Sequence, residues 1–258
     1  MPSTNTKSQE SREMRRRRWV PVGVLRRLEV VDLDLLGVRP ETRVLDVGCG
    51  VGRLMLRIAR RGCFVTGVEL QRPDLRSAQR LLDEFRQQVE LVEGDGGRIP
   101  FAADTFDFVT CTETLEHVAD PGLALRELAR VLKPGGHLVV SVPDTLPELI
   151  ARQMSELYRT DPWGHRRIFT RKSIERTVEA AGLRVYAKRL RNSVEAGYWT
   201  LLYLVDACPL LREWGVDALK RWRDRSNSEP YSLFYHVLDE AGNRVSPKSI
   251  AVYATKSP

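Results

Sequence analysis

Alternating glycines and two carboxylates are spaced as a nucleoside pocket requires. The glycines are Gly48, Gly50 and Gly52, in VLDVGCGVG. They follow an apolar run, and a backbone without Cβ atoms can turn tightly there and approach a ligand closely. Glu69 ends the next apolar run, where a carboxylate can accept hydrogen bonds from two ribose hydroxyls. Asp95 in EGDGG can accept one from an exocyclic amino group, while the Gly96 N–H faces a ring nitrogen. The GxGxG spacing matches neither the G-x-G-x-x-G fingerprint of dinucleotide-binding folds nor the phosphate-loop motif, so the glycines alone are weak evidence. The pocket is predicted because the glycines occur together with Glu69 and with Asp95–Gly96.

A second set of side chains has the types that bind a metal or move a proton. Glu113, Glu116 and His117 in ETLEH stand at i, i+3 and i+4, so a helix beginning here would carry all three on one face. His165 in WGHRRIFT is a candidate fourth ligand. A divalent cation at this set would hold both oxygens of an acceptor and lower a hydroxyl pKa. The alternative is that the glutamates only favour a helix N-terminus, with His117 and His165 as candidate bases.

The elements that position these residues alternate between strands and helices. Strands are predicted at 43–48, 64–70, 88–95, 106–112, 137–143, 183–190 and 249–256. Helices are predicted at 52–62, about 74–88, Leu123–Leu132 and within 170–182. This alternation predicts an α/β fold, a parallel sheet with helices on both faces. Ligands of such sheets bind outside the carboxyl ends of the strands, so the loops after Val47, Glu69, Glu93, Thr112 and Val142 should form the site.

These motifs, with FDFVTCTETLEHVADP and LKPGGHLVVSVP, resemble the class I S-adenosylmethionine-dependent methyltransferases, most of all the quinone-pathway and small-molecule O-methyltransferases, over about residues 42–190. The resemblance implies a Rossmann-like seven-stranded sheet of order 3-2-1-4-5-7-6 whose last strand is antiparallel. It implies S-adenosylmethionine as cofactor and S-adenosylhomocysteine as product. It also implies the cofactor contacts, which are Asp46 and Gly48–Gly52 (with Cys49) at the methionine end, Glu69 and Leu70 at the ribose, Asp95 and Gly96 at the adenine, and Thr112 and Glu113 beside them. Thr112 stands where methionine is common, and similar ExxEH sets bind metal in some of these enzymes.

The charge is concentrated in an N-terminal arm, residues 1–27. Eight Lys and Arg side chains against two Glu give this arm +6 of the net charge of +7. Such an arm can contact nucleic acid or anionic lipid, or can be a solvated terminus. The four cysteines show no paired or zinc-type spacing, which favours a reducing compartment, and we expect a cytoplasmic protein, peripheral at a membrane if lipid is its partner.

Residues 191–246 are predicted to be an apolar and aromatic lid inserted into a methyltransferase domain of residues 28–190 and 247–258. Within it, AGYWTLLYLVDACPLLREWG is too interrupted, by Asp206 and Pro209, to span a bilayer, and its apolar residues all round a helix predict burial. Next, LLREWGVDALKRWRDR combines tryptophans and basic residues, as helices on anionic membrane surfaces do. A partner or dimer face and plain packing are the alternatives.

Three functions are consistent with these patterns. The first is O-methylation of a small, apolar or lipid-like acceptor, such as a quinone-type compound or a natural product, by a monomer or homodimer. The second is an RNA methyltransferase that uses the basic arm, with metal-dependent 2′-O-methylation as one form; the nearly neutral body makes it the weaker hypothesis. The third is a non-catalytic binding module, which the intact glycines and acids disfavour.

Overall fold

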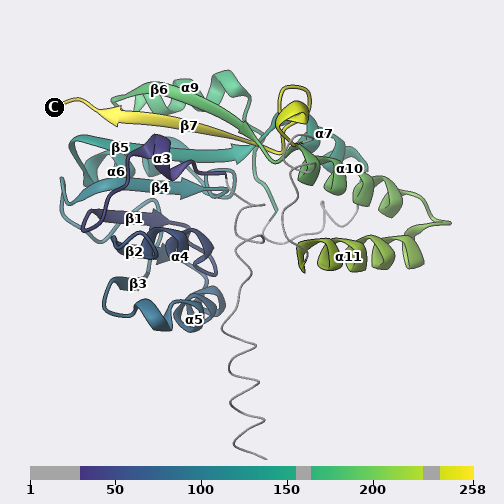
Figure 1. Cartoon of the computed structure of the whole chain (residues 1–258). Helices are drawn as coiled ribbons and strands as arrows, with labels where there is room; N and C mark the ends of the chain where they lie inside the picture. The colour runs from purple at the N-terminus through teal and green to yellow at the C-terminus, as the bar shows by residue number, and fades with distance from the viewer. Residues whose placement is uncertain (1–29, 155–163, 229–238) are drawn as a thin grey trace, which may run out of the picture.

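The fold is that of a computed structural model, which describes residues 30–154, 164–228 and 239–258. Its elements, labelled as in Figure 1, are α3 (Leu33–Leu36), β1 (Arg43–Val47), α4 (Arg53–Ala59), β2 (Phe64–Glu69), α5 (Arg72–Leu81), η1 (Asp83–Phe85), β3 (Val89–Glu93), β4 (Phe106–Thr112), α6 (Pro121–Val131), β5 (Leu132–Pro143), α7 (Thr145–Met154), α9 (Arg171–Ala180), β6 (Leu183–Arg191), α10 (Ser193–Ala207), α11 (Arg212–Ser228) and β7 (Ser249–Lys256). The N-terminal arm lies outside the described residues.

The strands form one sheet in the order β3-β2-β1-β4-β5-β7-β6. Strands β1 to β5 pair in parallel, and β7 runs antiparallel between β5 and β6. This confirms the predicted seven-stranded order and its antiparallel last strand. Because β7 is reversed, its amino end lies at the same edge of the sheet as the carboxyl ends of the parallel strands (Figure 1).

Helices cover both faces of the sheet and bury its apolar side chains. On one face α3, α4 and α5 pack against residues such as Val44 and Val65. On the other face α6 and α9 pack against residues such as Leu45 and Val109. Neighbouring residues of β1 thus point to opposite faces and both are fully buried, which is the pattern of a strand inside a two-sided α/β sandwich.

Local signals set where the helices begin. Asp120 caps α6 by accepting the Leu123 N–H, and Pro121 occupies its first turn, where a missing N–H costs nothing. Thr170 begins α9 with a capping box closed by Ser173.

Two expectations need correction. No helix begins at ETLEH: residues 113–119 form turns, and α6 starts only at Pro121, because a proline has its most favourable helical position in the first turn. The fifth strand begins at Leu132 rather than after the KPGG segment. The segment Lys133–Gly136 forms an irregular part of β5, where the register with β4 shifts between Phe106 and Phe108.

The segment between β6 and β7 contributes α10 and α11, which extend beyond the carboxyl edge of the sheet (Figure 1). Helix α10 packs against both α7 and α11. The expected burial of α10 is only partly right, because Tyr198 and Leu202 are buried whereas Leu201 and Leu204 are exposed. Among the described helices, none is both long and apolar enough to cross a membrane.

Candidate active site

A cavity of about 750 Å³ opens at the carboxyl ends of β1 to β4. Seven of the residues predicted to contact a cofactor lie in its wall: Gly48, Gly50, Glu69, Leu70, Asp95, Gly96 and Glu113. They come from the ends of four strands, β1 to β4, and parallel strands bring such segments together because their carboxyl ends share one edge. The remaining four, Asp46, Cys49, Gly52 and Thr112, are not in the wall.

The glycine turn is required by its backbone and by its neighbours. Gly48 has φ +71°, and a Cβ on it would lie 2.2 Å from Thr114 Oγ1, so no other residue fits. A Cβ on Gly50 would meet nothing within 4 Å, which leaves its side of the turn open to a ligand. The Gly50 N–H donates to Glu69 Oε2 at 2.9 Å and thereby ties the turn to the end of β2.

The two carboxylates of the nucleoside pocket are held differently. Glu69 accepts one backbone N–H on each oxygen, from Gly50 and, at 2.8 Å, from Gln71. Each oxygen keeps a second lone pair, so the carboxylate can still accept from a pair of hydroxyls. Asp95 is exposed, and its Oδ1 accepts the Gly97 N–H at 2.8 Å.

The four residues outside the wall each lie one or two residues along the chain from a residue of the wall. Asp46 is buried and accepts the Thr110 hydroxyl at 2.6 Å. Burial raises the Asp46 pKa to about 7, against the effect of the Thr110 hydrogen bond and together with the charge of Glu69. Burial also raises the pKa of the Cys49 thiol, so that residue is an inert packing group. Gly52 is the N-cap of α4, and the Thr112 carbonyl accepts the Thr114 hydroxyl.

A second cavity, of about 260 Å³, adjoins the first. The two share Glu113, His117 and Gly164 in their walls. Its other walls come from β5, α7, α10, the loop after β4, the loop before α9 and the residue before β7; they are Pro143, Pro147, Glu148, Ala196, Trp199, Tyr203, Glu116, His165 and Lys248. The wall of this chamber therefore includes two aromatic side chains, Trp199 and Tyr203, and the part that it shares with the first cavity carries Glu113 and His117.

The Glu113 carboxylate is hydrogen-bonded to serines of two other strands. Its Oε1 accepts the Ser141 hydroxyl at 2.8 Å, its Oε2 accepts the Ser249 hydroxyl at 3.2 Å, and Lys248 Nζ lies 3.9 Å from Oε2. Its backbone has φ +49°, which is uncommon for a residue with a side chain. Glu113 thus joins the end of β4 to β5 and β7.

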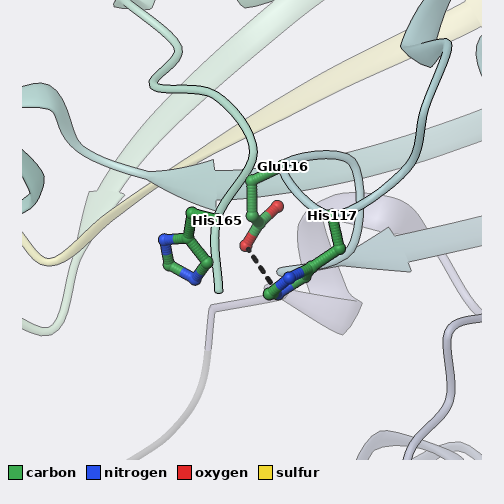
Figure 2. A group of neighbouring side chains, drawn as sticks. All are labelled: Glu116, His117 and His165. Atoms are coloured by element: carbon green, nitrogen blue, oxygen red, sulfur yellow. Dashed lines mark ion pairs between the residues drawn. The ribbon is translucent and has the colours of Figure 1, made fainter. Parts of the chain in front are cut away.

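Glu116, His117 and His165 converge without the helix that was expected to align the first two (Figure 2). One potential ligand atom from each lies within 4.8 Å of the others. The two imidazole rings meet edge to face with centroids 4.8 Å apart. The Arg166 N–H donates to the Glu116 carbonyl at 2.9 Å, and this bond holds the loop of His165 against the loop after β4.

The Glu116 carboxylate is the most unusual group of this cluster. It is 1% exposed, and neither oxygen has a hydrogen-bond partner among the described residues. Burial and the nearby Glu113 raise its pKa well above the usual value. Groups of this kind cost stability unless a proton or a cation compensates them. One carboxylate and two imidazoles are a donor set that suits a borderline divalent metal such as zinc, so the residues fit such an ion.

Sequence reasoning missed Glu148 and Lys248, and it did not single out Trp199 and Tyr203 as walls. Glu148 lies in the first turn of α7, which follows the carboxyl end of β5, in a connection that was expected to border the site. Lys248 directly precedes β7, whose amino end is at the site edge because this strand is antiparallel. Reading polar residues at both of these strand ends would have found the two charged side chains.

Comparisons with known proteins agree with this geometry. A family described as "Methyltransferase domain" matches residues 16–188, more than half of the chain. The ubiquinone biosynthesis O-methyltransferase of Aeromonas salmonicida (strain A449) is 35% identical over 155 residues, which are 55% of this chain and 63% of that enzyme. The enzyme of the same name from Xanthomonas campestris pv. campestris (strain B100) is 41% identical over 139 residues, 51% of this chain and 56% of that enzyme. These matches span less than two thirds of the relatives' own length.

Solved structures share the fold. Geranyl diphosphate methyltransferase in complex with S-adenosylmethionine superposes with a TM-score of 0.58 at 20% identity, over 87% of this chain and 82% of that one. The family match and the shared fold lead to the same assignment. The chain belongs to the class I S-adenosylmethionine-dependent methyltransferases and, among them, resembles the quinone-pathway O-methyltransferases.

Proposed function

We propose that this methyltransferase transfers the methyl group to a hydroxyl oxygen of a small, apolar acceptor held in the second cavity. The observation that carries the proposal is the contact between the two cavities across Glu113, His117 and Gly164. An acceptor in the smaller chamber would stack on Trp199 and Tyr203 and present its polar end toward the cofactor. The O-methyltransferases of ubiquinone biosynthesis, which the chain resembles, support the choice of oxygen as nucleophile.

The first cavity would hold S-adenosylmethionine, with Glu69 on the ribose hydroxyls and Asp95 with the Gly96 N–H on the adenine. Gly48 and Gly50 would allow the methionine end to lie against the turn. Asp46, Cys49, Gly52 and Thr112 would act through the residues that they support, because they lie outside the wall. Leu70 and Glu113 would complete the contact surface.

The reaction requires the acceptor oxygen to approach the sulfonium methyl in line. The O–C bond forms while the C–S bond breaks, its electron pair stays on sulfur, and S-adenosylhomocysteine leaves as a neutral thioether. The hydroxyl proton must go to a base, and His117 and His165 are the candidates, since both line the acceptor chamber. Much of the rate would come from holding the two reactants in this geometry.

As the alternative to a role as bases, His117 and His165 are, together with Glu116, the proposed ligands of a divalent cation. A bound cation would lower the pKa of an acceptor hydroxyl and hold two neighbouring oxygens. Glu113 is a weaker candidate ligand, because both of its oxygens accept hydroxyl hydrogen bonds. Glu116 is the strongest, because its buried carboxylate has no hydrogen-bond partner among the described residues.

We propose that an anionic membrane surface binds the side of α10 that carries the exposed Leu201 and Leu204, together with the turn that follows this helix. Trp199 and Tyr203 line the acceptor chamber from α10, whereas Leu201 and Leu204 of the same helix are exposed. This exposed apolar surface continues to Leu210 and Trp214, which are 86% and 64% exposed, and Lys220 and Arg221 follow on α11. A lipid-like acceptor could then pass from the membrane into the chamber along one helix. The basic arm that motivated the RNA hypothesis lies outside the described residues, and the named relatives favour a small molecule.

The test uses labelled S-adenosylmethionine and a matched series of catechols with alkyl chains of increasing length. We expect label in the organic phase for the free catechols and none for the same compounds with both hydroxyls already methylated. Trp199→Ala should raise KM most for the long-chain compounds, because it removes part of the aromatic wall, while Phe64→Ala on an exposed site of β2 serves as its control. Transfer to RNA or to amines, with none to any catechol, would refute the proposal.

A further inference from the structure

Glu148 and His165 are in contact with each other, and both line the acceptor chamber. Glu148 lies in the first turn of α7 and is largely buried, and its Oε2 is 2.5 Å from His165 Nδ1. The side chain of His165 is itself only 21% exposed. A hydrogen bond between two such shielded groups fixes the direction of the imidazole ring.

The start of α7 is anchored independently of this contact. The Asp144 N–H donates to the Lys248 carbonyl at 2.8 Å, and the Asp144 carboxylate accepts Arg171 Nε at 2.8 Å. The Thr145 hydroxyl donates to the Phe169 carbonyl at 3.0 Å. The carboxylate of Glu148 is therefore presented from a helix whose beginning is tied to β7, to α9 and to the loop before α9.

The position of the carboxylate determines which ring nitrogen carries the hydrogen. A carboxylate oxygen accepts, so the hydrogen of the contact must be on Nδ1. In the neutral ring Nε2 then has the lone pair, and it is the nitrogen that can accept a proton or bind a cation. Without the carboxylate the ring would lose both its fixed direction and this preference.

We propose that Glu148 is a positioning residue that holds His165 in the Nδ1–H form, with Nε2 directed to the acceptor. The inference rests on the proposed function only for the role of His165; the state of its ring is a separate property. Glu148 is not in the wall of the first cavity, and its hydrogen bond to His165 is the contact from which we infer its role.

The ring state can be measured directly in ¹⁵N-labelled protein. The chain has only four histidines, so long-range ¹H–¹⁵N spectra at about pH 8, where imidazoles are mostly neutral, can be assigned with His165→Gln. We expect the Nδ1–H pattern for His165 in the wild type and its loss in Glu148→Leu. Glu148→Gln should restore the pattern, because the amide oxygen can still accept. Glu175→Leu is the matched control, since Glu175 only pairs with Lys188 at the surface.

Kinetics and cofactor binding complete the test. Glu148→Leu should lower kcat about 10- to 100-fold, the usual effect of removing a partner behind a functional histidine. Its affinity for S-adenosylhomocysteine should not change, because Glu148 is not in the wall of that cavity, and this result also shows that the variant is folded. Glu148→Gln should recover most of kcat. The inference is wrong if Glu148→Leu keeps the Nδ1–H pattern or the wild-type kcat, or if Glu148→Gln restores the pattern without recovering kcat. Failure of the proposed function looks different: no catechol is methylated by the wild type, yet the His165 ring still responds to Glu148.

Discussion

Replacing Asp46 by Asn should change how stability depends on pH. Asp46 is 1% exposed, beneath the cofactor cavity, and its carboxyl accepts the Thr110 hydroxyl. Burial raises its pKa from 3.8 to about 7; the Thr110 hydrogen bond opposes this shift and the charge of Glu69 adds to it. The folded protein therefore binds a proton at Asp46 over a pH range in which the unfolded chain has released it.

The sign and size of the effect follow from these two values. A raised pKa gives stability that is complete below pH 3.8 and is lost as the pH rises through about 7. A difference of about 3 units corresponds to at most about 4 kcal/mol, at 1.36 kcal/mol per unit. Asparagine keeps the shape and accepts the same hydroxyl, but it has no proton to lose. The stability of Asp46→Asn relative to the wild type should therefore increase by up to this amount from low pH to about pH 8.

Urea unfolding of both proteins at several pH values measures this difference. Asp34→Asn is the control with the opposite sign, because a hydrogen bond and the charge of Arg61 lower the Asp34 pKa. A group of that kind stabilises above its unfolded pKa, and its contribution is lost as the pH falls. If the stabilities of Asp46→Asn and the wild type stay parallel at all pH values, Asp46 does not hold its proton and the reasoning from burial is wrong.

Three further results are expected. Asp95→Ala should weaken S-adenosylhomocysteine about tenfold or more in calorimetry, as loss of a hydrogen bond to a charged acceptor does, whereas Asp83→Ala, outside the cavity wall, should bind like the wild type. Wild-type protein should take up one zinc ion per chain in equilibrium dialysis and Glu116→Gln should take up much less; equal uptake by both would exclude Glu116 as a ligand. Leu210→Ser with Trp214→Ser should reduce sedimentation with phosphatidylglycerol vesicles about tenfold, and the exposed Leu123→Ser on α6 should not; no loss in the double variant would contradict the proposed membrane contact.

The sheet, and the grouping of the predicted residues around the first cavity, could be predicted from the sequence, because their signals are local. Strand β1 and the glycines after it are adjacent in the chain, and the edge of a parallel sheet brings Glu69 and Asp95 to the same cavity. The resemblance supplied the strand order, which periodicity alone does not give.

The acceptor chamber could not be predicted in the same way, because its walls are set by long-range packing. Trp199 and Glu148 meet there only because α10 packs on α7. Glu116 and His117 were expected to lie together on one face of a helix, and that helix does not form. They meet His165 because the Arg166 N–H donates to the Glu116 carbonyl and holds the two loops together. The bonds of Glu113 to Ser141 and Ser249 depend on which strands neighbour each other, a fact that its sequence spacing does not contain.

The place of β7 in the sheet has a consequence for the order in which the protein assembles during synthesis. β7 (Ser249–Lys256) pairs with β5 on one side and with β6 on the other. In the described sheet, β6 therefore has no strand to pair with until β7 has left the ribosome. The half of the sheet that carries the first cavity can form earlier, because β1 to β4 precede β7 in the chain. The anchors of Glu113, by contrast, arrive with Lys248 and Ser249. A ribosome-bound chain should thus complete the walls of its first cavity well before those of its second.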